Sequence, residues 1–341
     1  MAKKTVKLGI IGCGIAAREL HWPALSVLRD EFEVVSVCNH TPEKAQQLAQ
    51  TVASAYGRET PYHLDYHKML ASPRVEAVAI ILPVELNREV CTHAARAGKH
   101  ILVEKPLAES EEQANELLRL EEHNQELVMM VAENFRYRPI FRELSNAVAE
   151  GAIGTPFFVE WRHWERIDPE TNAFAKTSWR IHHRYEGGFV TDGGVHNIAA
   201  LRDIFGELDS VGSFSASVNP RIGRTDTLAW LFRSSGRKGI PPLAGILSLG
   251  FSVLGLDESR LTVLGSSGAI IAEGTVMKIH SLSRQPTSVR EYPDDGGYIE
   301  EYRDFHRAIT SGCRPRSTFS EAHADLQTIL RALRDAAISH P

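Results

Sequence analysis

Short apolar runs alternate with amphipathic segments through about the first 125 residues. Four such runs occupy residues 8–11, 33–38, 77–82 and 100–103. Helical spacing follows the runs: the segment 87–97 ends at Gly98, a common helix stop, and a capping box, Ser110-x-x-Gln113, opens another helix. Apolar strands that alternate with helices are typical of a parallel sheet covered on both faces.

The pattern changes after Leu127. Apolar and polar residues now alternate with a period of two, and few helical segments separate the runs. Strands are predicted at 127–135, 157–166, 210–218, 247–253, 261–264 and 268–271, and helices at 142–151, 299–311 and 320–338. The sequence therefore predicts an α/β fold. A doubly wound parallel sheet in residues 1–126 is followed by an α+β domain, residues 127–341, with a large open mixed or antiparallel sheet.

Composition narrows the classes of function. A chain of 341 residues exceeds the usual size of a single core, so two domains are expected. The formal net charge of −5, with no long basic run, argues against nucleic-acid binding. No apolar stretch is long enough to span a membrane, and the N-terminus lacks the apolar core of a signal peptide. Four scattered cysteines fit a reducing compartment, so we expect a cytoplasmic protein without membrane contact.

A glycine-rich turn follows the first predicted strand. Gly12 allows a tight turn, Gly14 leaves room for a phosphate, and Ala17 permits close packing of helix on strand. The helix N-terminus then offers free N–H groups to a pyrophosphate. In this strand–turn–helix context the motif predicts a Rossmann dinucleotide site. The alternative is a glycine-rich turn with no ligand.

The end of the second strand bears on the choice of dinucleotide. An acidic residue there would bind the ribose hydroxyls of NAD. This chain has Asn39, His40 and Thr41 instead. None of them repels a 2′-phosphate, His40 can donate to it, and Asn39 can bind a ribose hydroxyl. Both NAD and NADP stay open as the cofactor, and the sequence slightly favours NADP.

A second motif, Glu104-Lys105-Pro106, ends another apolar strand. A residue before proline is pushed out of the helical region, so Lys105 is expected at the carboxyl edge of the sheet, where ligands bind. There its ammonium group can hydrogen-bond a substrate oxygen and stabilise negative charge on it. The alternative is a solvated surface lysine.

Asp192 and His196 are four residues apart, so they share one face if the segment is helical. Oxidation of a carbinol releases the hydroxyl proton, which a histidine is suited to accept, and a nearby carboxylate can orient the imidazole. The alternative is an ion pair on a helix surface. The glycine pairs 187–188 and 193–194 bracket this site, and we expect close approach of a ligand to explain them.

These motifs belong to a longer pattern that resembles the Gfo/Idh/MocA family, named for glucose–fructose oxidoreductase and inositol dehydrogenase. The pattern includes His21-x-Pro23-Ala-Leu25, Leu82-Pro83, residues 97–106, 134–137 and 187–196, and Phe205-Gly206. The resemblance implies a Rossmann domain followed by a domain whose open sheet often forms the oligomer interface, here in a dimer or tetramer. It also implies oxidation or reduction of a carbinol carbon in a sugar, cyclitol or related polyol.

The resemblance assigns site residues. Lys105 maps onto the family's catalytic lysine, and Asp192 and His196 onto residues that line the substrate site, the histidine being the usual proton acceptor. The implied cofactor contacts are Gly12, Gly14, Ile15, Ala16, Asn39, His40, Thr41, Leu82, Pro83, Asn87, Glu104 and Lys105. The implied substrate contacts are Lys105, Arg136, Tyr137, Trp179, Arg180, Asp192 and His196, with ordinary packing an equal alternative for positions 136, 137, 179 and 180.

The chain departs from the family pattern at two positions. It has Ala199 where many members have a third acidic residue, which puts a hydroxyl-binding contact in doubt. It has Asn87 where many have histidine, which is expected to alter how the loop covers the nicotinamide. His182 and His183 are adjacent and lack a third ligand at metal spacing, so no metal site is expected.

One predicted strand is polar on both sides. Alternation along residues 157–166 places Trp161, His163 and Glu165 on one face and Arg162, Trp164 and Arg166 on the other. We expect neither face to be core and one to line a pocket or an oligomer contact.

Two other functions stay open beside the oxidoreductase. One is a nucleotide-binding regulatory protein, and the other is a glycosidase that uses transient oxidation by tightly held NAD. The presence of Lys105, Asp192 and His196 favours an enzyme over a regulator.

Overall fold

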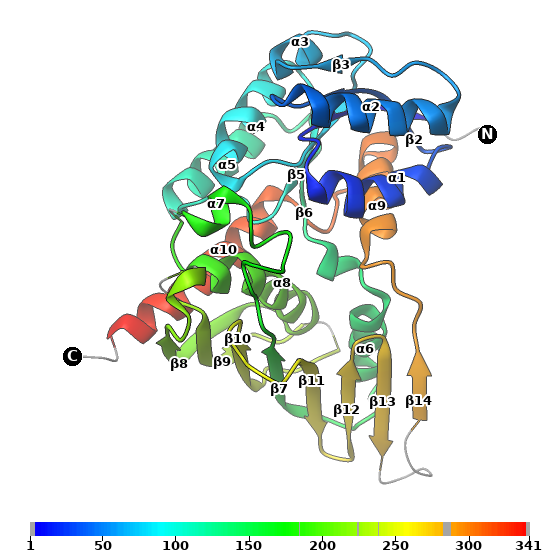
Figure 1. The fold of residues 1–341 in the computed structure, drawn as a ribbon. Helices are drawn as coiled ribbons and strands as arrows, with labels where there is room; N and C mark the ends of the chain where they lie inside the picture. The colour runs from blue at the N-terminus through cyan, green and yellow to red at the C-terminus, as the bar shows by residue number, and fades with distance from the viewer. Residues whose placement is uncertain (1–3, 184, 224, 238, 282–287, 339–341) are drawn as a thin grey trace. The chain divides into compact units, whose positions relative to one another are not determined.

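A six-stranded parallel sheet in the order β3-β2-β1-β4-β5-β6 forms the first of two compact units in the computed structural model (Figure 1). This unit comprises residues 1–134 and 298–324, and the second comprises residues 135–297 and 325–341. The structure describes residues 4–183, 185–223, 225–237, 239–281 and 288–338.

The strands of the first unit are β1 (Val6–Ile11), β2 (Phe32–Cys38), β3 (Tyr62–His63), β4 (Ala77–Ile80), β5 (His100–Glu104) and β6 (Met129–Ala132). Its helices are η1 (Ala17–His21), α1 (Trp22–Val27), α2 (Pro42–Tyr56), α3 (Tyr66–Leu70), η2 (Val84–Leu86), α4 (Asn87–Arg96), α5 (Glu111–His123) and α9 (Tyr298–Ser311). Every residue of β4 and of β6 is buried. Burial on both faces explains why these strands read as continuous apolar runs.

The order of the strands places a ligand crevice at one point of this sheet. β1 pairs with β2 on one side and with β4 on the other, so the connections leave β1 in opposite directions. Open parallel sheets bind ligands outside the carboxyl ends of the strands at such a switch point. Gly12 follows β1 there, and Leu82 and Pro83 follow β4.

The C-terminal part of the chain contributes a helix to the first unit. In α9, Tyr302 and Phe305 pack their rings against Phe32 of β2, with centroid distances of 5.6 and 6.2 Å. The boundary expected at residues 126 and 127 also falls just before β6, which pairs in parallel with β5. The first unit is therefore formed by two separate segments of the chain.

The second unit contains an eight-stranded sheet in the order β14-β13-β12-β11-β7-β10-β9-β8. Its strands are β7 (Pro156–Trp164), β8 (Leu208–Ala216), β9 (Thr227–Ser234), β10 (Ala244–Gly250), β11 (Glu258–Gly265), β12 (Gly268–Glu273), β13 (Val276–Ser281) and β14 (Ser288–Glu291). The remaining helices of the described residues are η3 (Asn134–Tyr137), α6 (Pro139–Ala149), α7 (Ser178–Ile181), α8 (Gly188–Phe205), η4 (Pro220–Ile222) and α10 (Phe319–Ile338). β7 pairs with β10 in parallel, and the other pairs are antiparallel, so the sheet is mixed.

One face of this sheet is covered and the other is open. In β9, Leu228, Trp230 and Phe232 are buried, whereas Ala229 and Leu231 between them are exposed. The buried side chains face α8, which packs on β9 and β10, and α6 packs on β12 and β13. The α/β fold expected from the sequence, a doubly wound parallel sheet followed by an open mixed sheet, is confirmed. Across the described residues, every helix is too short or too polar to cross a bilayer.

Candidate active site

Gly12 and Gly14, the two glycines after β1, are each explained by a different physical constraint. Gly12 has a φ of 102°, and a Cβ there would collide with the carbonyl oxygen of Ile81. The fold itself therefore requires Gly12. A Cβ at Gly14 would have no described atom within 4 Å. This open space, directly before η1, fits the close approach of a dinucleotide pyrophosphate.

The side chain of Asn39 stabilises the turn after β2 through two hydrogen bonds. Its side chain is 8% exposed, Oδ1 accepts the Cys13 N–H at 3.1 Å, and Nδ2 donates to the Thr41 carbonyl at 3.3 Å. Both polar atoms of Asn39, which was expected to bind a ribose hydroxyl, thus form hydrogen bonds within the protein. His40 is exposed and Thr41 half-buried, so both are accessible on this turn.

Arg18 lies in the same region and was not among the residues singled out from the sequence. It lies in η1, immediately after the glycine motif, and its Nη1 donates to Oε1 of Gln47 in α2 at 2.7 Å. Because α2 begins directly after the turn at residues 39–41, Arg18 brings a positive charge to the helix beside that turn. Its place after the motif was a signal that the sequence offered.

At the end of β5, Glu104, the residue before Lys105, is held by a chain of hydrogen bonds. Oε2 of Glu104 accepts the Lys105 N–H at 3.0 Å, and Oε1 accepts a hydrogen bond from Nε2 of His21 at 2.7 Å. Nδ1 of His21 lies 2.8 Å from the hydroxyl of Tyr302. His21 is 1% exposed, and burial raises the pKa of Tyr302 well above its usual range. Lys105 is half-buried, and the peptide bond between it and Pro106 is cis.

The other cofactor contacts expected from the sequence lie around the same edge of the sheet. Ile15 and Ala16, which are helical and directly precede η1, are half-buried, as are Leu82 and Pro83 after β4. Asn87, at the start of α4, is fully buried and donates to main-chain carbonyl groups of the segment 104–107, which favours a structural role over the cofactor contact that the resemblance implies. The first unit thus gathers these residues where β1, β4 and β5 end.

In the second unit, Asp192 and His196 lie on α8. Asp192 is 4% exposed, and its Oδ2 accepts from Nε of Arg180 at 2.7 Å. The Arg180 guanidinium lies over the ring of Trp179, 4.0 Å from its centroid. The structure thus brings three of the expected substrate residues into one cluster.

His196 belongs to an aromatic stack. Its ring is parallel to that of Phe135, with centroids 4.7 Å apart and planes inclined by 21°. Phe135 in turn stacks on Trp161 at 6.4 Å. This contact fixes one face of the imidazole against a buried aromatic core. Phe135 was not singled out from the sequence, although it lies within the segment 134–137 of the family pattern.

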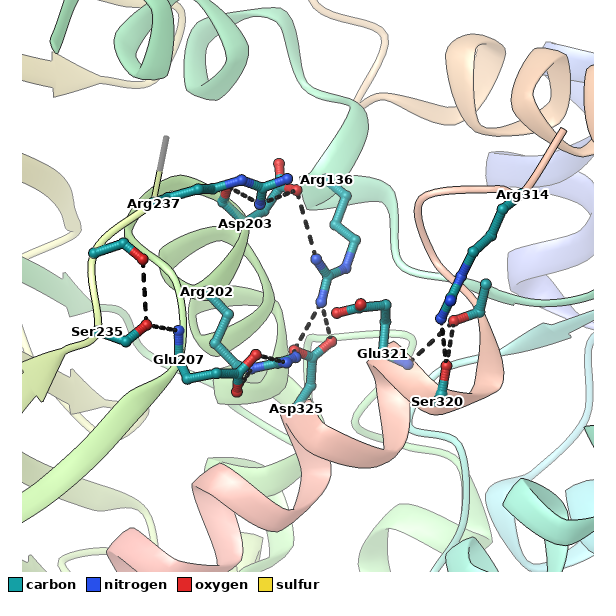
Figure 2. Close-up of polar contacts among 12 residues, drawn as sticks. Arg136, Arg202, Asp203, Glu207, Ser235, Arg237, Arg314, Ser320, Glu321 and Asp325 are labelled. Carbon is teal, nitrogen blue, oxygen red and sulfur yellow. Dashed lines mark hydrogen bonds and ion pairs between the residues drawn. The ribbon is translucent and has the colours of Figure 1, made fainter. Parts of the chain in front are cut away.

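Arg136 lies in a buried ion-pair cluster (Figure 2). Its Nη2 donates to both carboxylate oxygens of Asp325, at 2.8 and 2.7 Å, and Arg202 pairs with the same carboxylate. Arg202 also donates to Glu207 at 2.6 and 3.0 Å. Arg136 is 3% exposed and Tyr137 is 4% exposed. This burial favours a structural role for both, instead of the substrate contacts that the resemblance implies.

The glycines around Asp192 are explained by protein packing. A Cβ at Gly193 would lie 2.7 Å from the ring of Phe251, and one at Gly188 would lie 2.7 Å from Nε2 of His183. At Gly194 it would meet Leu249. The expectation that a ligand approaches these glycines is therefore wrong, because side chains of the same unit fill the space.

Trp161 and His163 lie on β7, the strand that the sequence predicts to be polar on both faces. Trp161 is 1% exposed, so the inward face of β7 is partly core, contrary to expectation. His163 lies near Ser259, at 3.2 Å, and Glu165, at 3.4 Å. Within the described ranges, no three His, Cys, Asp or Glu side chains are arranged to hold a metal ion.

Comparison with known proteins supports the fold and identifies the family. Residues 6–132 match the family described as "Oxidoreductase family, NAD-binding Rossmann fold", and residues 141–271 match the GFO/IDH/MocA C-terminal domain. The solved structure of an oxidoreductase from Thermotoga maritima superimposes with a TM-score of 0.87 at 32% identity, covering 98% of this chain and 97% of that one.

Two relatives illustrate the sequence similarity. An uncharacterized protein of Saccharomyces cerevisiae is 30% identical over 271 residues, which is 79% of this chain and 74% of that protein. The 1,5-anhydro-D-fructose reductase of Ensifer adhaerens is 25% identical over 337 residues, 96% of each chain. Other relatives are dehydrogenases named for D-apiose, inositol and levoglucosan. The chain therefore belongs to the Gfo/Idh/MocA family of NAD(P)-dependent oxidoreductases.

Proposed function

We propose that this enzyme transfers a hydride between the nicotinamide and a carbinol or carbonyl carbon of a sugar, cyclitol or related polyol. The relatives named for such compounds support this substrate class. The single observation that carries the site is the buried Asp192, held by Arg180, one helical turn before His196. A carboxylate and an imidazole at this spacing on one helix suit the transfer of a hydroxyl proton.

Three side chains have proposed roles in the reaction. His196 accepts the hydroxyl proton during oxidation and returns it during reduction. Asp192, held in place by Arg180, orients the imidazole for this transfer. Lys105 donates a hydrogen bond to the substrate oxygen as it gains negative charge. When bound, the nicotinamide supplies the hydride acceptor or donor.

The residues around β1 and β2 support NADP as the preferred cofactor. Residues 39–42 contain no carboxylate, and the Asn39 oxygen is engaged by Cys13. Arg18 and His40 supply positive or hydrogen-bond-donating groups, which suit a 2′-phosphate. We expect NADPH to bind more tightly than NADH in a nucleotide titration, and Arg18→Gln to remove most of the difference. Tenfold tighter binding of NADH by the wild type would overturn the preference.

The open face of the second sheet supports a homo-oligomer, a dimer or tetramer. Leu231 and Ile246 are directly opposite each other on β9 and β10, and both are exposed. Phe214 is exposed on β8 beside them, opposite Ala229. Contiguous exposed apolar side chains mark interaction sites. Light scattering should give a mass above one chain, and Leu231→Glu should lower it.

The proposed function is tested by a spectrophotometric screen. Purified enzyme is mixed with NAD⁺ or NADP⁺ and with myo-inositol, levoglucosan or D-apiose, and in the reductive direction with 1,5-anhydro-D-fructose and NADH or NADPH. A change in reduced-nicotinamide absorbance that is present in wild type and absent in Lys105→Ala supports the proposal. Nucleotide binding without turnover of any compound would instead favour a regulatory protein.

A further inference from the structure

Asn87 makes an unusual set of hydrogen bonds at the start of α4. Its Nδ2 donates to the main-chain carbonyl groups of Glu104 and Pro106 at 3.0 Å each, and lies 3.4 Å from that of Leu107. The side chain is fully buried, and its Oδ1 has no hydrogen-bond partner among the described residues. The amide is therefore held in place by its two N–H donors alone.

These carbonyl groups lie on both sides of Lys105. The Glu104 carbonyl belongs to the peptide that precedes Lys105, and the Pro106 carbonyl follows it. The N–H of Lys105 is taken by the carboxylate of Glu104. The side chain of Asn87, from α4, thus binds the main chain both before and after Lys105. A movement of the main chain on either side of Lys105 would break one of these buried hydrogen bonds.

The hydrogen bonds of the Asn87 side chain are not made within its own helix, α4. An asparagine at the N-cap binds N–H groups of the first helical turn, but Asn87 is the first helical residue and follows the N-cap residue Leu86. The amide of Asn87 instead points its donors at a segment 17 to 20 residues further along the chain. The chemistry required at this position is that of an N–H donor facing carbonyl groups, which a histidine ring can also supply with one nitrogen.

We propose that Asn87 is a positioning residue for Lys105: it fixes the main chain on both sides of the lysine and thereby sets the position of the ammonium group. This inference rests on the catalytic role proposed for Lys105. Displacement of a catalytic group by about 1 Å is enough to cost about 10²-fold in rate. Replacing Asn87 should therefore lower kcat and leave nucleotide affinity nearly unchanged.

The test is a double-mutant cycle between Asn87→Leu and Lys105→Ala. The probe is the compound of the panel above that gives the highest wild-type turnover. Asn87→Leu should lower kcat about 10- to 100-fold, with the Kd for NADPH within about twofold of wild type. In the Lys105→Ala background, Asn87→Leu should change kcat by less than about twofold, because the group that it positions is already gone.

Two further variants separate positioning from general damage. Asn87→His restores one N–H donor and should therefore recover most of the lost kcat. Asn124→Ala removes a comparable bond, from Nδ2 to the Leu120 carbonyl at 2.7 Å, and should leave kcat unchanged. Amide hydrogen exchange of peptide 101–109, which needs no substrate, should speed up in Asn87→Leu and not in Asn124→Ala.

The outcomes are distinguishable. If Lys105→Ala retains wild-type turnover, both the catalytic role of Lys105 and the role of Asn87 fail. If Lys105→Ala is impaired and Asn87→Leu lowers kcat equally in both backgrounds, only the positioning role is overturned. Wild-type kcat in Asn87→Leu, or unchanged hydrogen exchange at 101–109, also contradicts it.

Discussion

Oε1 of Glu104 lies 2.7 Å from Nε2 of His21, which connects the residue before Lys105 to η1, the helix that follows the glycine-rich turn. The other ring nitrogen of His21 meets the hydroxyl of Tyr302 at 2.8 Å. His21 and Tyr302 are buried and the Glu104 side chain is 14% exposed, so these hydrogen bonds are largely shielded from water. The chain of contacts gives the end of β5 a fixed support inside the first unit.

His21→Leu removes the centre of this chain and leaves the Glu104 carboxylate, 14% exposed, without the hydrogen bond from His21. We expect the free energy of unfolding to fall by about 2–4 kcal/mol, as measured by urea denaturation. His123→Leu, at the exposed end of α5, serves as the control and should change it by less than about 0.5 kcal/mol. Equal effects of the two substitutions would contradict the role assigned to His21.

Gly12 and Gly14 should respond differently to alanine. At Gly14 the added methyl group meets open space, so Gly14→Ala should unfold within about 0.5 kcal/mol of wild type. It should nevertheless weaken nucleotide binding at least about tenfold. Gly12→Ala meets the Ile81 carbonyl and should destabilise the fold. The measurements are thermal unfolding without nucleotide and fluorescence titration with NADPH; unchanged affinity in Gly14→Ala is the contrary result.

Arg136→Leu tests a structural against a substrate-binding role. Asp325 keeps Arg202 as a partner, but the buried cluster loses a charge and a bidentate contact. We expect a loss of about 3–5 kcal/mol in the free energy of unfolding, while KM of the folded fraction stays within about twofold of wild type. Arg142→Leu, on the exposed surface of α6, is the matched control. A large rise in KM with unchanged stability would restore the substrate-binding interpretation.

Stability should fall in mild acid because of His100. Its Nδ1 accepts the N–H of Val128 at 3.0 Å, and burial lowers the pKa of the ring below its ordinary value. Burial lowers the pKa of His323 in the same direction. The unfolded chain therefore binds more protons below about pH 6.5, so the stabilisation is present above that pH and is lost as pH falls through the folded pKa. Urea denaturation between pH 7.5 and 5 should show this loss, and His100→Asn, which keeps an acceptor, should reduce the slope. An unchanged slope would exclude His100 as its source.

Local sequence patterns predicted the elements whose environment is set locally. The run at 8–11 and the turn at Gly12 correspond to β1 and the switch point, because apolar strands and glycine turns follow from neighbouring residues. The strand β9 was missed although Leu228, Trp230 and Phe232 alternate with exposed residues. The apolar run within the eight residues of β9 indicates a strand.

Distant pairings lay beyond such reasoning. Arg136 pairs with Asp325, which is 189 residues further along the chain. The burial of Arg136 therefore cannot be predicted from the residues that neighbour it in the sequence. The glycines at 193 and 194 were attributed to a ligand because Phe251 and Leu249, which fill the space, come from another part of the chain. The sequence of α9 likewise does not indicate which unit the helix packs against, because its amphipathic spacing fits the core of either unit. In the structure α9 belongs to the first unit.

The most direct test of the central claim, hydride transfer with Lys105 and His196 in catalytic roles, is the single-turnover rate of nicotinamide reduction or oxidation. It should be measured with the best substrate of the screen in wild type, Lys105→Ala and His196→Ala, each saturated with nucleotide. We predict a fall of about 10²–10⁴-fold in both variants, with nucleotide affinity retained. A wild-type rate in either variant would contradict the claim.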